Sequence, residues 1–138
     1  MPNLPEGTFK IPRTGNKMLK FDGALIAEAS SRRVHGQERN RWFEIGVYQA
    51  KDQWIVWVAY RTHWQGEHDH DWAEIYATPE FLIDALRKDY DPLSYLGGFP
   101  PHESFADKQA RLEETIRRDY QSLITQIAEK ISAEEEIT

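Results

Sequence analysis

The sequence contains no cysteine, and this absence excludes several kinds of chemistry. A chain without cysteine has no disulfide framework, no thiolate zinc site and no cysteine nucleophile. No apolar run reaches the roughly eighteen residues that a membrane-spanning helix needs, and residues 1–20 lack the apolar core of a signal peptide. These absences predict a cytoplasmic protein with no membrane segment.

Short motifs of common catalytic and nucleotide-binding sites are also absent. The chain has no G-x-S-x-G elbow, no H-E-x-x-H, no P-loop and no G-x-G-x-x-G. Histidines, serines and carboxylates are nevertheless present, so the absence of motifs weakens an enzymatic interpretation without removing it. We therefore predict a non-catalytic protein, with catalysis kept as an alternative.

The composition is that of one ordinary folded domain. Hydrophobic residues make up 40% and aromatic residues 12% of the 138-residue chain, which is incompatible with general disorder. Prolines and glycines recur through residues 1–17, so we expect an extended or partly disordered arm there. Residues 18–138 are predicted to form a single α+β domain.

Charge is distributed unevenly along the chain. Residues 1–63 carry ten Lys/Arg and six Asp/Glu, whereas residues 64–138 carry seven and seventeen. Nucleic-acid affinity depends mainly on neutralising backbone phosphates, and the formal net charge here is −6. General nucleic-acid binding is therefore not expected, unless the basic half of the chain forms one face.

Four segments have the period-two alternation of β-strands, namely residues 18–29, 41–49, 54–62 and 72–77. In the second, Phe43, Ile45 and Val47 form an apolar face. The third is apolar on both faces, which marks a central strand. The short connections predict a four-stranded antiparallel β-meander.

Two helices follow these strands. Thr78 and Pro79 are typical of a helix start, and the helix is expected to end near Lys88 and to pack on the sheet. A long helix is predicted over residues 105–132, too long for the strands beneath it. It either lies across the sheet with a frayed end or pairs distally with another subunit. Its apolar seam consists of Leu112, Ile116, Tyr120, Leu123, Ile127 and Ile131.

A cluster of histidines and acids lies between the third and fourth strands. Imidazole and carboxylate side chains are common ligands of divalent transition metals, and His68 and His70 would share a face in an extended chain. The alternative is a solvated loop, where polar residues are expected in any case. No cofactor is predicted unless this cluster binds a divalent metal. The candidate ligands are His63, His68, His70 and Asp71.

The second face of the sheet is rich in aromatic residues. They form either a second buried layer or an open platform for a ligand, a peptide or a base. The platform alternative joins them to a basic segment that carries Arg32, Arg33, Arg39 and Arg41, as a site for single-stranded nucleic acid. The candidate ligand-binding residues are Trp42, Tyr48, Trp57, Arg61, Trp72 and Tyr76.

The sequence thus favours a non-catalytic interaction or regulatory module. We expect it to act as a homodimer through the seam that runs from Leu112 to Ile131, with another protein as a further partner. The alternatives are a metal-binding protein or metal-dependent enzyme, and a single-stranded nucleic-acid-binding protein.

Overall fold

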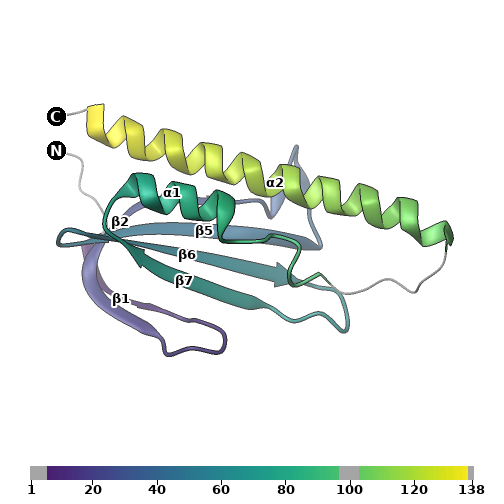
Figure 1. Ribbon diagram of the computed structural model, residues 1–138, viewed down its shortest axis with the longest axis horizontal. Coiled ribbons are helices and arrows are strands. Elements are labelled where there is room, and N and C mark those ends of the chain that lie inside the picture. Colours follow the sequence, from purple (N-terminus) through teal and green to yellow (C-terminus); the bar gives the residue numbers. More distant parts are fainter. Residues whose placement is uncertain (1–5, 97–102, 137–138) are drawn as a thin grey trace.

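A computed structural model gives the structure of the protein over residues 6–96 and 103–136. The strands and helices are β1 (Glu6–Ile11), β2 (Leu19–Ser30), β3 (Arg33–Val34), β4 (Gln37–Glu38), β5 (Arg41–Ala50), β6 (Gln53–Thr62), β7 (His70–Tyr76), α1 (Pro79–Lys88) and α2 (Glu103–Glu136). The main sheet is antiparallel with the order β1-β2-β5-β6-β7, and both helices lie on one side of it (Figure 1). The predicted α+β class, with a short helix and a long C-terminal helix, is confirmed.

The sheet has five strands where the sequence predicts four. The additional strand, β1, comes from residues placed in the N-terminal arm, and it pairs antiparallel with β2. Pro5 and Pro12 flank this strand rather than interrupt it, and an edge strand tolerates such neighbours. Phe9 and Ile11 alternate with Thr8 and Lys10 over only four residues. The prolines and glycines around them therefore outweigh this short strand pattern in the sequence. Residues 1–5 of the arm lie outside the described residues.

One face of the sheet, which we call the helix-covered face, contains the larger core. Phe43, Ile45 and Val47 of β5 point to it, as predicted. Antiparallel partners share a face, so their neighbours Val58 and Val56 on β6 join them. The helices cover this layer with buried Leu82, Leu86, Ile116, Tyr120, Leu123, Ile124, Ile127 and Ile131.

The opposite face, which we call the hairpin-covered face, has a smaller core. Ile11 of β1 is buried against Tyr48, Ile55 and Ala73, although three strands separate β1 from β7 in the sheet order. This contact requires the β1–β2 hairpin to curl across the sheet, and Figure 1 shows β1 on the side opposite the helices. The hairpin thus replaces a helix as the cover of this face.

Because of a β-bulge in β2, side chains of this strand at positions 25 and 27 contact different cores. The register shifts between Leu25 and Ala27, so Ile26 is the extra residue. Leu25 packs in the hairpin-covered cluster, whereas Ala27 belongs to the helix-covered one. Gly23 lies just before the bulge, where an added Cβ would come 2.3 Å from the carbonyl oxygen of Gln49. Any larger residue at position 23 would clash with the backbone of β5, so the close approach of β2 to β5 requires glycine here.

Local signals explain both helices. The Thr78 hydroxyl accepts a hydrogen bond from the backbone N–H of Phe81 at 3.1 Å, with Pro79 at the first helical position, as the sequence predicts. Helix α1 lies over β6 and β7, and α2 over β2 and β5. The hydroxyl of Tyr120 on α2 donates to the carbonyl of Leu86 at 2.6 Å, which ties the two helices together.

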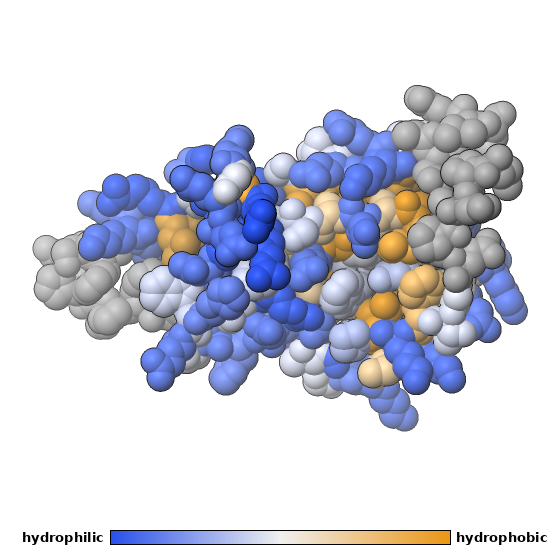
Figure 2. Space-filling view, turned by 180° about the vertical axis from the view of Figure 1, so that it is seen from behind, coloured by the Kyte–Doolittle hydropathy of each residue, from blue (hydrophilic) through white to orange (hydrophobic). Residues whose placement is uncertain are grey.

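The surface seen from behind is mostly polar. Figure 2 shows apolar residues interrupted by hydrophilic ones, with the larger apolar patches in the right half of that view. Among the described residues, no helix has the length and apolar character that crossing a bilayer requires.

Candidate functional site

The structure divides the six predicted ligand-binding residues between the two faces of the sheet. Trp42, Tyr48, Trp57 and Arg61 belong to the hairpin-covered face, because Trp42 pairs with Arg61 and Tyr48 is flanked by Ile55. The other two, Trp72 and Tyr76, lie on β7 and pack against the helix-covered core instead. The six residues therefore do not form one platform.

Covering groups bury the two aromatic residues of β5 on the hairpin-covered face. The ring of Tyr48 lies 4.8 Å from that of Phe9 and 5.5 Å from that of Phe21, both from the hairpin. The ring of Trp42 contacts His63 edge-on at 4.9 Å and carries the Arg32 guanidinium at 4.9 Å. These aromatic residues form a second buried layer, so a broad stacking surface for bases is absent at these two positions.

Charged groups on the same face form a hydrogen-bonded network. The Asp71 carboxylate accepts bonds from the Trp57 indole at 2.9 Å and from the Arg61 guanidinium at 2.8 Å. The Glu44 carboxylate accepts the indole N–H of Trp42 at 3.2 Å. Each of these two carboxylates thus holds a tryptophan in place.

The arginines of the basic segment each have a partner within the chain. Arg32 lies over Trp42, and Arg33 pairs with Glu38 at 3.2 Å on the surface. Two others bridge distant elements, Arg39 to Asp119 on α2 at 3.1 Å and Arg41 to Glu67. Paired guanidinium groups have less charge to offer a phosphate backbone, so this segment gives the nucleic-acid hypothesis no added support.

The Arg41–Glu67 pair is the most buried ion pair among the described residues. The two side chains are 11% and 4% exposed, and the Arg41 Nε–H donates to Glu67 Oε2 at 2.9 Å. The same carboxylate accepts the hydroxyls of Tyr60 at 2.6 Å and Thr62 at 3.1 Å. Since each group has several partners, the pair holds the β6–β7 loop against the sheet.

The four predicted metal ligands are not gathered at one point. His63 packs on Trp42, and His68 is exposed. His70 stacks on Tyr95 at 3.7 Å on the helix-covered side, whereas Asp71, the next residue on the strand, faces the other way. Across residues 6–96 and 103–136, no three His, Cys, Asp or Glu side chains are arranged to hold a metal ion.

His70 is nevertheless an unusual side chain. Burial lowers its pKa, with the neighbouring Asp71 carboxylate acting in the opposite direction. Its Nδ1 is buried without a hydrogen-bond partner among the described residues, as is the hydroxyl of Tyr90. Desolvation of the ring favours the neutral imidazole, so we expect protonation of His70 to be linked to the stability of the fold.

The predicted seam of α2 faces the chain's own sheet. Ile116, Tyr120, Leu123, Ile127 and Ile131 are all buried in the helix-covered core. Leu112 is partly buried against the same core. The heptad-like spacing therefore reflects packing of a long helix on a sheet, and these side chains are already covered within one protomer.

The outer edge of β7 is the feature that sequence reasoning missed. Asp71 directs its backbone away from β6, since its carbonyl accepts the Thr14 N–H at 2.8 Å and its N–H donates to the Thr14 hydroxyl at 2.8 Å. Alternate residues of an antiparallel strand direct their backbone N–H and C=O groups to the same edge. The backbone groups of Ala73 and Ile75 therefore also point away from β6. No backbone partner from the described residues meets either of them.

Two exposed apolar side chains flank this open edge. Ile75 of β7 is 47% exposed on the hairpin-covered side, and Phe81 of α1 is 62% exposed on the other side. Phe81 and Ile83 are two residues apart, which is about 200° around a helix. Because Ile83 lines the groove between α1 and α2, Phe81 faces away from α2, toward the free edge of β7.

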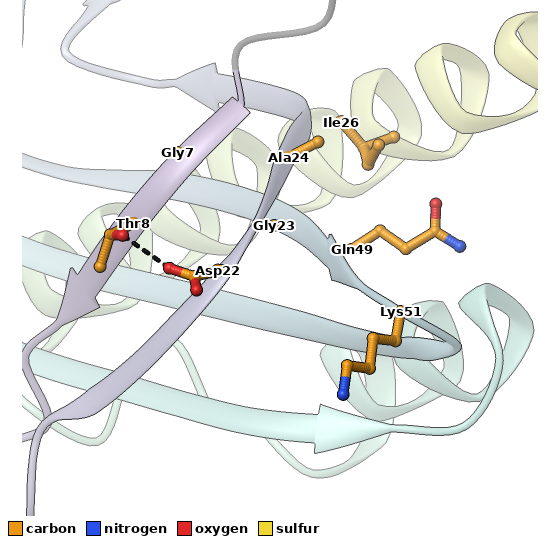
Figure 3. A pocket seen from close by; sticks show the side chains of 8 residues that line it. All are labelled: Gly7, Thr8, Asp22, Gly23, Ala24, Ile26, Gln49 and Lys51. Atoms are coloured by element: carbon orange, nitrogen blue, oxygen red, sulfur yellow. Dashed lines mark hydrogen bonds between the residues drawn. The ribbon is translucent and has the colours of Figure 1, made fainter.

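A large surface hollow lies at the far end of the hairpin, with a volume of about 800 Å³. Figure 3 shows its lining: Thr8 and Asp22 lie on one side, joined by a 2.6 Å hydrogen bond, and Gln49 and Lys51 extend on the other. These polar groups do not converge on a common point, so the hollow is a weak candidate for a binding site.

Comparisons with known proteins add no functional information. The chain matches no protein family model, and no curated protein or solved structure was found to be similar to it.

Proposed function

We propose that the protein is a non-catalytic interaction module that acts as a homodimer, joined through the free edges of β7. The observation that carries the proposal is the outward backbone of Ala73 and Ile75, with exposed Ile75 and Phe81 on either side of it. An unpaired strand edge is a template for another strand, and natural proteins usually cover or blunt it. The lack of catalytic motifs in the sequence supports the non-catalytic part.

Thr14 limits the pairing to the second half of β7. Because Thr14 occupies both backbone groups of Asp71, an added strand starts its hydrogen bonds at Ala73. A two-fold axis at Glu74 would oppose two carboxylates, which is unfavourable. An axis at Ile75 instead pairs Ile75 with its own copy and sets Glu74 opposite Tyr76 of the second copy, whose hydroxyl can donate to a carboxylate. We therefore place the axis at Ile75.

The same axis makes the edge self-complementary on both faces of the sheet. On the hairpin-covered side the two Ile75 side chains meet, and on the helix-covered side both Phe81 rings lie beside the new strand pair. Isologous contacts of this kind are the commonest arrangement in homodimers. The interface differs from the one that the sequence suggests, because the α2 seam is already buried in the protomer.

The test is the molar mass in solution over a wide range of concentration, measured by light scattering after size exclusion. The wild-type chain should give twice 16.2 kDa at high concentration. The Ile75→Lys variant should be monomeric, since it places two ammonium groups at the axis. Ile75→Val should keep the dimer, and Met18→Lys, at an exposed site outside β7, should have no effect.

Two results would contradict the proposal. One is a wild-type chain that stays monomeric at every concentration, and the other is a dimer that Ile75→Lys leaves intact. A dimer that instead dissociates when Leu112, partly exposed on α2, is changed to Lys would return the interface to the helix seam.

A further inference from the structure

We propose that a cavity lined by β2, β5, β6 and α2 binds a small organic ammonium ion. The cavity has a volume of about 500 Å³, within the usual range of about 300–1,000 Å³ for small-molecule sites. It lies on the β2–β5 side of the sheet, away from the β7 edge, so the inference is independent of the dimer. The residues that carry the argument are Glu28, Glu44, Gly46, Tyr48, Trp57 and Lys130.

A tyrosine hydroxyl without a hydrogen bond among the described residues lies at the wall of this cavity. Tyr48 is only 8% exposed, yet its hydroxyl has no hydrogen bond among the described residues. The hydroxyl lies over Gly46, 3.0 Å from the position that a Cβ there would take. The cavity gives access to this hydroxyl, which can therefore donate a hydrogen bond to a ligand there or accept one from it. A glycine at position 46 leaves the space that this arrangement needs.

The sign of the charge in the cavity selects a cation. Glu28 and Glu44 both line it, and Glu28 forms no ion pair within the described part of the chain. Burial raises the pKa of Tyr48, and the Glu28 carboxylate raises it further, which indicates that this carboxylate acts on the hydroxyl. Two carboxylates and a phenol oxygen therefore act on the same space.

Lys130 is the one cationic residue in the cavity lining. Its ammonium group donates a short hydrogen bond to the backbone carbonyl of Glu28, which fixes it at the rim. Two carboxylates and one ammonium line the cavity, and the Arg61 guanidinium near it also acts on Glu44, so Glu28 contributes most of the net negative charge. Lys130 therefore opposes a cationic ligand and should weaken its binding.

Aromatic walls favour an organic cation over a metal ion. Tyr48 and Trp57 both line the cavity, and electron-rich ring faces attract ammonium and guanidinium groups. Trp57 already has the Arg61 guanidinium 6.0 Å from its ring centre. Calcium and magnesium prefer about six or more oxygen ligands, and this lining offers too few. A primary ammonium can instead donate to both carboxylates and to Tyr48.

The experiment is an isothermal titration of the full chain with agmatine and with n-butylammonium. We expect saturable binding at one site per chain. Glu28→Gln and Glu44→Gln should each weaken it roughly tenfold, the effect of losing a charge-assisted hydrogen bond. Glutamine at position 44 can still accept the Trp42 indole N–H, so that contact is retained. Lys130→Met should tighten binding, because it removes the opposing charge.

Two controls separate this site from general attraction to an acidic protein. Glu38→Gln removes an exposed carboxylate elsewhere and should leave binding unchanged. Uncharged n-butanol, matched in its alkyl chain, should not bind. The proposal is overturned if neither amine binds saturably, if Glu38→Gln weakens binding as much as Glu28→Gln, or if Lys130→Met fails to tighten it. The melting temperature of each variant confirms that it is folded.

Discussion

The two faces of the sheet bury very different numbers of side chains. Among the described residues, sixteen buried side chains form the helix-covered cluster and four form the hairpin-covered one. A charged pair adjoins each cluster: Arg41–Glu67 contacts Tyr60 of the larger one, and Arg61–Asp71 lies beside the smaller one. The hairpin covers only part of its face, and a cavity lies on the same face where no residue of β1 lines it.

We expect the helix-covered face to contribute most of the stability, and the less covered surfaces to carry the proposed binding sites. Burial of apolar area is the main stabilising term in folding, and most of it occurs under α1 and α2. The proposed ligand cavity lies on the hairpin-covered face beside the hairpin, and the proposed dimer edge is one that no described backbone pairs with. Substitutions on each face test whether the two faces contribute differently to stability.

The largest expected effect is in the helix-covered core. Leu82 is fully buried, and Leu82→Ala should lower the free energy of unfolding by about 4 kcal/mol, through lost burial and a cavity that close packing cannot fill. Ile55 is equally buried on the other face, but Ile55→Ala should cost about 2 kcal/mol because the hairpin can collapse onto the space. Urea denaturation measures both. Equal losses would show that the two covers are equally rigid.

The next effect compares two ion pairs, one for each face. Glu67→Gln leaves the Arg41 guanidinium buried without its carboxylate, and should cost about 3 kcal/mol. Asp71→Asn should cost about 1 kcal/mol, because Arg61 is more exposed and has Asp69 at 4.0 Å as a second partner. The same denaturation measurement separates the two. If Asp71→Asn lowered the free energy of unfolding more than Glu67→Gln, the Arg61–Asp71 pair would be the more important of the two.

The smallest effect concerns His70 and pH. Because burial lowers the pKa of His70 in the folded state, the unfolded chain binds its proton more tightly. The contribution of His70 to stability is therefore complete above its unfolded pKa of about 6.5 and is lost as the pH falls below that value. His70→Phe should keep the stack on Tyr95 and flatten the melting temperature across this range. His68→Phe, at an exposed site, should not flatten it.

The strands that carry the helix-covered core were predictable, whereas β1 was not. Phe43, Ile45 and Val47 alternate over a long segment, so β5 follows from the sequence. In β1 the alternating pair Phe9 and Ile11 was the available signal, but the surrounding prolines and glycines outweighed it. A short edge strand depends on pairing with its neighbour, and that pairing is a tertiary contact.

The candidate sites depended more strongly on tertiary structure. Alternation gave Trp42, Tyr48, Trp57 and Arg61 a common face, but the register of β7 sends Trp72 and Tyr76 to the opposite side. Register is set by how strands pair across the sheet, which no single strand specifies. The spacing of the α2 seam likewise fits a coiled coil or a sheet, since both need an apolar stripe.

The sequence by itself determined the elements of this protein: the α+β class, the central strands, the Thr78 cap and the apolar stripe of the long helix. Tertiary structure alone decided what each apolar surface packs against. In the tertiary structure the α2 stripe packs on the sheet, the β1–β2 hairpin covers part of the second face, and no other described strand pairs with the outer edge of β7. The physical reason is that periodicity records which side of an element is buried, whereas the partner depends on contacts between residues far apart in the chain.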